Sequence, residues 1–96
     1  MRHVYLVTYD VSDPRRLRRV YRTMRGFGQH LQLSVFVCDL TASARIQMMG
    51  KLLDAIHHLE DQVLIIDLGA TDSHPIKNIE TLGRPSAIRE RGPVIV

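Results

Sequence analysis

The sequence predicts an α+β fold, in which the strands of one sheet combine with two helices. Three patterns support this prediction. A run of strand-forming residues opens the chain at 3–9, an amphipathic helix pattern follows at 14–25, and residues 30–40 alternate with the period of a strand. The chain of 96 residues is long enough for a single domain, residues 1–96, around one modest core.

The first strand runs directly into Asp10, and the first helix follows closely. Ser12 or Asp13 is placed to cap this helix, and Pro14 suits its first turn. The apolar side chains of the helix repeat at i, i+3, i+4 and i+7 and so share one face: Leu17, Val20, Tyr21 and Met24. Gly26 is placed to end the helix in a left-handed turn.

Four further elements are predicted along the chain. Residues 30–40 form a second strand, and Thr41 or Ser43 opens a second helix. The apolar stripe of this helix consists of Ile46, Met49, Leu53 and Ile56, flanked by Met48 and Leu52. A third strand spans residues 63–68 and a fourth spans residues 76–82.

The order of these elements allows two topologies. Read literally, they follow the order β-α-β-α-β-β. The ferredoxin-like order β-α-β-β-α-β would instead give a four-stranded antiparallel sheet with both helices on one face. That order follows if residues 28–40 hold two strands bent at Gln32, or if the second helix lies within a split βαβ unit with residues 76–82 as the last strand. The sequence pattern leaves the choice open.

Residues 84–96 form a C-terminal tail that ends in an apolar segment. Gly92 and Pro93 introduce the β-branched residues Val94, Ile95 and Val96. Such a segment could complete the sheet of its own chain or add a strand to the sheet of a partner.

Basic residues are concentrated in the first half of the chain. Residues 1–50 contain eight Arg and three Asp, a net charge of +5, whereas residues 51–96 contain five basic and seven acidic residues, a net charge of −2. Arginine outnumbers lysine eleven to two, and its planar side chain with several donors suits phosphate. A GC-rich genome would also account for the ratio, but not for the clustering.

Composition argues against several classes of protein. The sequence has no apolar run long enough for a transmembrane helix and no secretion signal, so we expect no membrane partner. One cysteine, Cys38, allows neither an internal disulfide nor a cysteine metal cluster, which favours a reducing cytoplasm. His57, His58, Glu60 and Asp61 do not predict a metal site, because adjacent residues at a helix end point in different directions.

The arrangement that bears most on function is Asp10 at the end of a strand, next to a helix with six arginines: Arg15, Arg16, Arg18, Arg19, Arg22 and Arg25. Arginines can hold the phosphates of a phosphodiester, and a carboxylate can hold a divalent metal. Simpler interpretations exist, because Asp10 could start a turn or help to cap the helix, and the arginines could form a solvated surface. No acidic residue follows these arginines at i+4 within the helix, which favours phosphate contact.

Three motifs, taken together, resemble a known family. They are residues 7–13 (Val-Thr-Tyr-Asp-Val-Ser-Asp), Gly-Gln followed by Gln and Ser-Val-Phe within residues 28–36, and residues 82–85 (Leu-Gly-Arg-Pro). In order, spacing and chain length they are similar to the CRISPR-associated Cas-two family, small adaptation proteins with reports of metal-dependent nuclease activity. The sequence departs from that family at His30, Leu31 and Val37, where Arg, Val and Glu are common. A secondary acidic role at Val37 is therefore absent.

The resemblance implies a fold and a site. It implies the ferredoxin-like order and a symmetric homodimer, across which the C-terminal segment pairs. It also implies that Asp10 of both protomers holds one Mg²⁺, with Tyr9, Asp10 and Phe36 as the catalytic residues. A metal-bound water would then attack a phosphodiester. The expected nucleic-acid contacts are Arg15, Arg16, Arg18, Arg19 and Arg22.

Two functions from different classes follow from the resemblance. The first is a CRISPR adaptation protein of antiviral defence, which dimerises, binds duplex DNA and scaffolds the integrase of the Cas-one family during spacer acquisition. The alternative is a Mg²⁺-dependent endonuclease that acts on RNA or DNA. A ferredoxin-like regulator that binds a small ligand is a third hypothesis, and the arginine helix argues against it.

Overall fold

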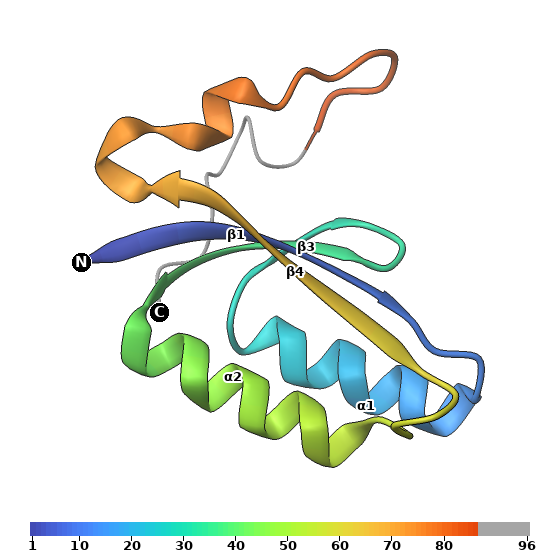
Figure 1. The fold of residues 1–96 in the computed structure, drawn as a ribbon. Helices are drawn as coiled ribbons and strands as arrows, with labels where there is room; N and C mark the ends of the chain where they lie inside the picture. The colour runs from blue at the N-terminus through green and yellow to red at the C-terminus, as the bar shows by residue number, and fades with distance from the viewer. Residues whose placement is uncertain (87–96) are drawn as a thin grey trace.

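The computed structural model describes residues 1–86 of the chain. These residues form four strands, two α-helices and two short 3₁₀ helices (Figure 1): β1 Arg2–Asp10, α1 Pro14–Arg25, β2 Gln29–Gln32, β3 Val35–Thr41, α2 Ala42–Ala55, β4 Gln62–Ala70, η1 Thr71–Ser73 and η2 Pro75–Asn78. The expectation that Val94–Val96 adds a strand concerns residues outside the described part of the chain.

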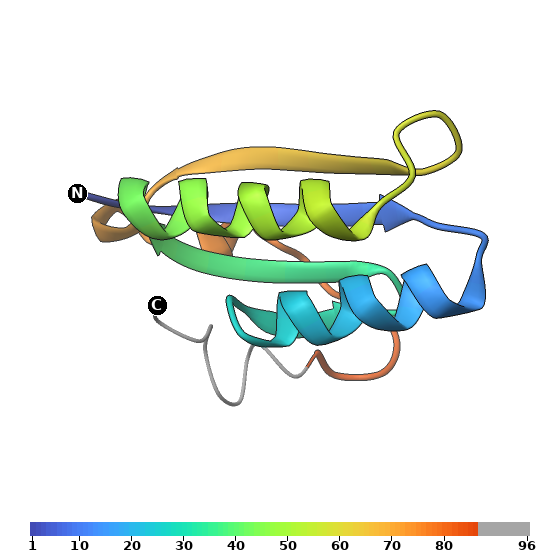
Figure 2. The same cartoon turned by 90° about the horizontal axis from the view of Figure 1, so that it is seen from below.

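The four strands form one antiparallel sheet in the order β2-β3-β1-β4. Val7 in the centre of β1 lies opposite Phe36 of β3 and Ile65 of β4. Both helices lie side by side on one face of this sheet, and the segment after β4 crosses the opposite face (Figures 1 and 2). The chain therefore has the ferredoxin-like order β-α-β-β-α-β, and the α+β prediction is confirmed.

The stretch predicted as one strand over residues 30–40 is a hairpin. Leu33 and Ser34 form its turn, and Gln32 pairs with Val35. The alternative with two strands near Gln32 is therefore correct, and the literal order β-α-β-α-β-β is wrong. The alternation continues through the turn because both arms of a hairpin have a period of two, and the turn contains none of the Gly, Pro, Asn or Asp residues that usually mark one.

The strand predicted at residues 76–82 is absent from the described structure. η2 occupies Pro75–Asn78, and residues 79–86 contain neither strand nor helix. The apolar side chains of Ile76 and Ile79 instead pack onto the sheet beside Val4 and Val37. Their spacing therefore reflects the packing of a loop on a sheet and not the pairing of a strand.

A buried side chain fixes the start of this crossing segment. Asp39 of β3 is 2% exposed and accepts a hydrogen bond of 2.8 Å from the hydroxyl of Thr71. A second partner is Arg2, whose Nη1 lies 3.8 Å from the Asp39 carboxylate. The paired carboxylate positions the chain where it leaves β4 and turns over the sheet.

Helix α1 begins as predicted but ends differently. The side chain of Asp13 accepts a hydrogen bond of 3.0 Å from the backbone N–H of Arg16, so Asp13 is the cap. Gly26 has a right-handed φ of −78°, so the predicted left-handed turn is wrong. The glycine that the packing requires is Gly28, where a Cβ would collide with Sγ of Cys38 and with the carbonyl oxygen of Val37.

The predicted apolar stripe of α2 is largely wrong. The buried side chains of this helix are Ala44, Met48, Leu52 and Ala55. Ile46 and Leu53, two of the predicted stripe, are 66% and 52% exposed. The large apolar residues span a broad arc of the helix, and the side of this arc that continues into two small alanines is the one that packs into the core. Thr41 caps the helix, as one of the two predicted alternatives.

The core lies between the sheet and the helices. The side chains of β1 that point toward the helices are Tyr5, Val7 and Tyr9. They pack with Val20 and Met24 of α1, and the remaining large members of the core are Phe27, Phe36, Leu40, Met48 and Leu52. The apolar face predicted for α1 is therefore correct in its centre, while Leu17 at its start is 36% exposed.

A buried ion pair joins the start of α1 to the loop before β4. The carboxylate of Asp61 accepts hydrogen bonds of 2.7 and 3.2 Å from Arg16 and one of 2.8 Å from the backbone N–H of His57. These donors, with that of Arg16 foremost, hold the pKa of Asp61 below its ordinary value. Arg16 also contacts Glu60 at 3.2 Å.

This ion pair predicts a pH-dependent stability. Because the folded pKa of Asp61 is lowered, its contribution is complete above the unfolded pKa of about 3.9 and is lost as the pH falls through the folded pKa. We expect Asp61→Asn to melt several degrees below the wild type at neutral pH, with a gap that closes in acid. Thermal melts followed by circular dichroism measure the gap, and Asp54→Asn, an exposed carboxylate on α2, is the control. A gap that stays constant with pH would contradict this assignment.

Candidate nucleic-acid interface

Asp10 is the last residue of β1, and its side chain is exposed. It lies opposite Gln62 of β4 in the sheet, at the end where the chain turns toward α1. Alternation along the strand sends Tyr9, the preceding residue, toward the helices, where it is 6% exposed. The end of β1 therefore places an accessible carboxylate next to a buried phenol.

A crevice of about 450 Å³ opens between the end of β1, helix α1 and the turn of the β2–β3 hairpin. The side chains that line it include Tyr9, Asp10, Arg18, Tyr21, His30 and Leu33. The fold thus brings together three residues that the sequence predicted as functional, Tyr9, Asp10 and Arg18. It adds Tyr21, His30 and Leu33, which sequence reasoning did not assign to a site.

Four aromatic rings support this crevice. The ring of His30 lies 5.0 Å from that of Phe36 and 5.2 Å from that of Tyr21, and Phe36 also contacts Tyr21 at 5.7 Å and Tyr9 at 6.3 Å. Phe36 is fully buried and packs against the other three rings. Burial raises the pKa of Tyr9 above its ordinary value. The catalytic roles expected of Tyr9 and Phe36 stay predictions.

Four arginines of α1, Arg15, Arg18, Arg19 and Arg22, form what we call the arginine face. All four are exposed, and none forms a salt bridge within residues 1–86. Arg16, predicted to belong with them, is instead held by Asp61 and Glu60. Its partners lie about one half of the chain away in sequence, so inspection of the helix alone could not find them.

The fold offers a metal ion one carboxylate here. Within the described residues, no three His, Cys, Asp or Glu side chains gather as a set of ligands. Asp10 is an oxygen donor of the kind that Mg²⁺ prefers, and it is accessible, so it fits the ion as one ligand of several. Further ligands must come from water, from a nucleic acid or from a second copy of the chain.

On the face of the sheet away from the helices, β4 presents exposed apolar side chains, next to half-buried side chains of β1. Leu64 and Ile66 of β4 are 49% and 42% exposed, and they lie opposite Thr8 and Leu6 of β1. We call these four residues the open face. Within the described residues, no helix is long and apolar enough to cross a membrane.

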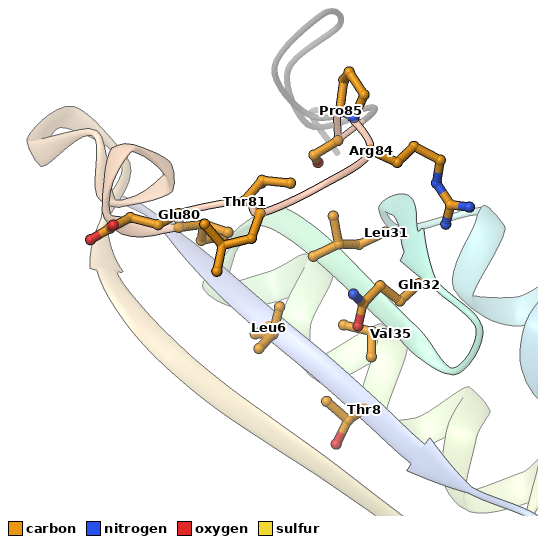
Figure 3. A pocket seen from close by; sticks show the side chains of 12 residues that line it. Leu6, Thr8, Leu31, Gln32, Val35, Glu80, Thr81, Arg84 and Pro85 are labelled. Carbon is orange, nitrogen blue, oxygen red and sulfur yellow. The ribbon is translucent and has the colours of Figure 1, made fainter.

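A second cavity, of about 670 Å³, includes Leu6 and Thr8 of the open face and lies beneath the segment that follows η2. Figure 3 shows Leu6 and Thr8 of β1 and Leu31 of β2 on its floor, with Thr81 and Pro85 on the chain that crosses it. The Leu-Gly-Arg-Pro motif at residues 82–85 is thus part of this crossing segment and not the end of a strand.

The structure therefore defines a ferredoxin-like domain with an accessible carboxylate at the end of its central strand and an exposed arginine face beside it. The family model described as CRISPR associated protein Cas2 matches residues 1–74, which is most of the chain and includes both features. The chain belongs to this Cas2 family, as the three sequence motifs predicted.

Individual relatives agree with this assignment. The chain is 42% identical over 94 residues to a protein of Rhodospirillum rubrum named CRISPR-associated endoribonuclease Cas2 1, covering 98% of this chain and 91% of the relative. It is 47% identical over 73 residues to CRISPR-associated endoribonuclease Cas2 of Geobacter sulfurreducens, covering 76% of this chain and 77% of the relative.

Solved structures share the fold. The crystal structure of Streptococcus pyogenes Cas2 superposes with a TM-score of 0.74 at 33% identity, covering 83% of this chain and 99% of that one. A hypothetical protein from Thermus thermophilus gives a TM-score of 0.76 at 22% identity, covering 88% of this chain and 94% of that one, and supports the fold alone.

Proposed function

We propose that this chain is an adaptation protein of CRISPR antiviral defence, which binds duplex nucleic acid as a homodimer and scaffolds the integrase during spacer acquisition. The observation that carries the proposal is the arginine face, on a chain of the Cas2 family. The four guanidinium groups have no salt-bridge partner within residues 1–86, so their charge is available to an external anion.

The spacing of the arginine face suits a row of phosphates. Arg15, Arg18 and Arg22 are separated by three and four residues, so they follow one side of α1, and Arg19 lies beside them. Arginine binds phosphate through two parallel N–H donors, and such contacts position a protein on a duplex without reading its sequence. A scaffold that must accept spacers of any sequence needs this kind of contact.

The open face supports the homodimer. It exposes Leu64 and Ile66 of β4 beside the half-buried Leu6 of β1, and two copies of such a patch can bury each other about a two-fold axis. The partner beyond the dimer is, in this proposal, the integrase of the Cas-one family. In this proposal the protein meets DNA and the integrase in the cytoplasm. The single cysteine, Cys38, is a free, buried thiol, which suits a reducing compartment.

A second candidate function is that of a Mg²⁺-dependent endonuclease. It is favoured by the exposure of Asp10 in the same crevice as Arg18, and by the endoribonuclease names of the relatives. Asp10 from each protomer would hold the ion, which when bound supplies an activated water and offsets charge on the phosphodiester. Arg18 would bind a phosphate of the RNA or DNA substrate next to Asp10.

If the open face forms the dimer interface, charged side chains introduced there should weaken the dimer. Leu64→Lys combined with Ile66→Lys should convert a dimer into a monomer, because it would bury unpaired ammonium groups in the interface. Sedimentation velocity measures the change. The matched control is Ile46→Lys combined with Leu53→Lys, which charges two comparably exposed apolar residues on α2. Dissociation by the control pair, or a wild type that is monomeric at every concentration, would refute this interface.

The arginine face predicts a salt-dependent affinity. Replacing Arg15, Arg18, Arg19 and Arg22 by Ala should weaken binding of a blunt duplex DNA, and the slope of log K against log salt should fall by about 0.9 for each phosphate that the variant no longer neutralises. Stability should change little, because all four side chains are exposed. Fluorescence anisotropy at several salt concentrations measures the slope. The control is Lys77→Ala with Arg84→Ala, two exposed basic residues outside α1. Equal slopes for wild type and the arginine variant would place the DNA elsewhere.

Asp10→Asn separates the two candidate functions. The substitution keeps the size of the side chain but removes the charge that would hold Mg²⁺. We expect it to abolish any Mg²⁺-dependent cleavage of RNA or DNA, while duplex binding and spacer acquisition with the integrase stay near the wild-type level. Asp72→Asn, an exposed carboxylate on η1, is the control. Loss of acquisition together with cleavage would make the chemistry, and not the scaffold, the essential function.

A further inference from the structure

The crevice beside the arginine face differs in character from the helix that borders it. Its walls are mostly carbon, from the rings of Tyr21 and His30 and from the side chain of Leu33. Leu33, at the tip of the hairpin turn, is 88% exposed. Electrostatic binding of phosphates requires neither aromatic rings nor a leucine side chain. The crevice is therefore suited to a ligand that has an apolar part as well as a charged one.

The His30 ring is accessible and held in place. In the tautomer that carries its proton on Nε2, it donates a hydrogen bond of 3.3 Å to the carbonyl oxygen of Leu33. Its ring rests against Phe36 and meets the edge of Tyr21, so little freedom is left to lose when a ligand stacks on it. A flat, pre-positioned aromatic surface of this kind is suited to a planar ligand.

Charge beside the crevice restricts the ligand further. Arg18 is part of the lining and also of the arginine face, so a phosphate bound to this residue would adjoin the crevice. Asp10, also in the lining, would repel a second phosphate but can accept a hydrogen bond from an amino group. A cavity of about 450 Å³ is in the size range of sites for small molecules.

We propose that the crevice receives one unpaired nucleobase of the bound nucleic acid, stacked between His30 and Leu33, with the adjoining phosphate on Arg18. A base within a duplex is covered on both faces by its neighbours and cannot enter, so the ligand is an overhanging or extruded nucleotide. This inference rests on the proposed nucleic-acid binding and adds to it a preference for duplex ends or bulges with one unpaired base.

The test uses the full chain and two DNA probes. One is a blunt duplex, and the other is the same duplex with a single 2-aminopurine overhang, whose fluorescence falls when the base stacks. We expect wild type to bind the overhang probe at least about fivefold more tightly than the blunt one, with quenching. His30→Ala should remove the preference and the quenching without weakening the blunt duplex. Tyr21→Leu is a second variant, and His58→Ala, an exposed histidine outside the crevice, should behave as wild type.

The outcomes separate this inference from the function on which it rests. If wild type binds both probes equally, or if His30→Ala and Tyr21→Leu both keep the preference, the crevice does not hold a base while the arginine face still binds duplex. If wild type binds neither probe, the nucleic-acid function fails and the base site with it. Circular dichroism of each variant shows whether the fold is retained.

Discussion

β1 hydrogen-bonds to β3 on one side and to β4 on the other, so a shift of this strand would disrupt the whole sheet. Its side chains alternate between two environments. Tyr5, Val7 and Tyr9 enter the core under the helices, while Leu6 and Thr8 face away from them. Moving the register by one residue would exchange these two sets. The position of Asp10 at the accessible end of the strand is therefore fixed by the burial of the residues before it.

The arginines of α1 fall into two groups, according to whether they pair with a carboxylate of the fold or face solvent. Arg16 neutralises the buried carboxylate of Asp61 and so joins the start of α1 to the loop before β4. The arginine face has no such partner within the described residues. A buried carboxylate without its partner is costly, whereas exposed guanidinium groups cost the fold little. The same residue type thus serves stability at one position and remains available for phosphate at its neighbours.

The two faces of the molecule suit different partners. The crevice and the arginine face lie on the side of α1 and the β2–β3 turn, and they combine positive charge with aromatic rings. The open face lies on the other side of the sheet, where Leu64 and Ile66 are apolar and accessible. A protein that pairs with itself through one surface can present its charged surface twice, in a symmetric arrangement. The arginine face and the open face have no residue in common.

The sequence by itself determined the family, the α+β class, the start of α1 and the core face of that helix, because these depend on local spacing and on short motifs. It also identified Asp10 and the arginines as candidates. Only the tertiary structure decided that residues 30–40 are a hairpin, that residues 76–82 cross the sheet without pairing, and that Ala44 and Met48, not Ile46, face the core. Only the structure could separate Arg16 from its neighbours and place His30 beside Tyr21. Each of these features depends on contacts between residues distant in sequence. A periodic pattern indicates which side of an element is apolar, but not which other element packs against that side.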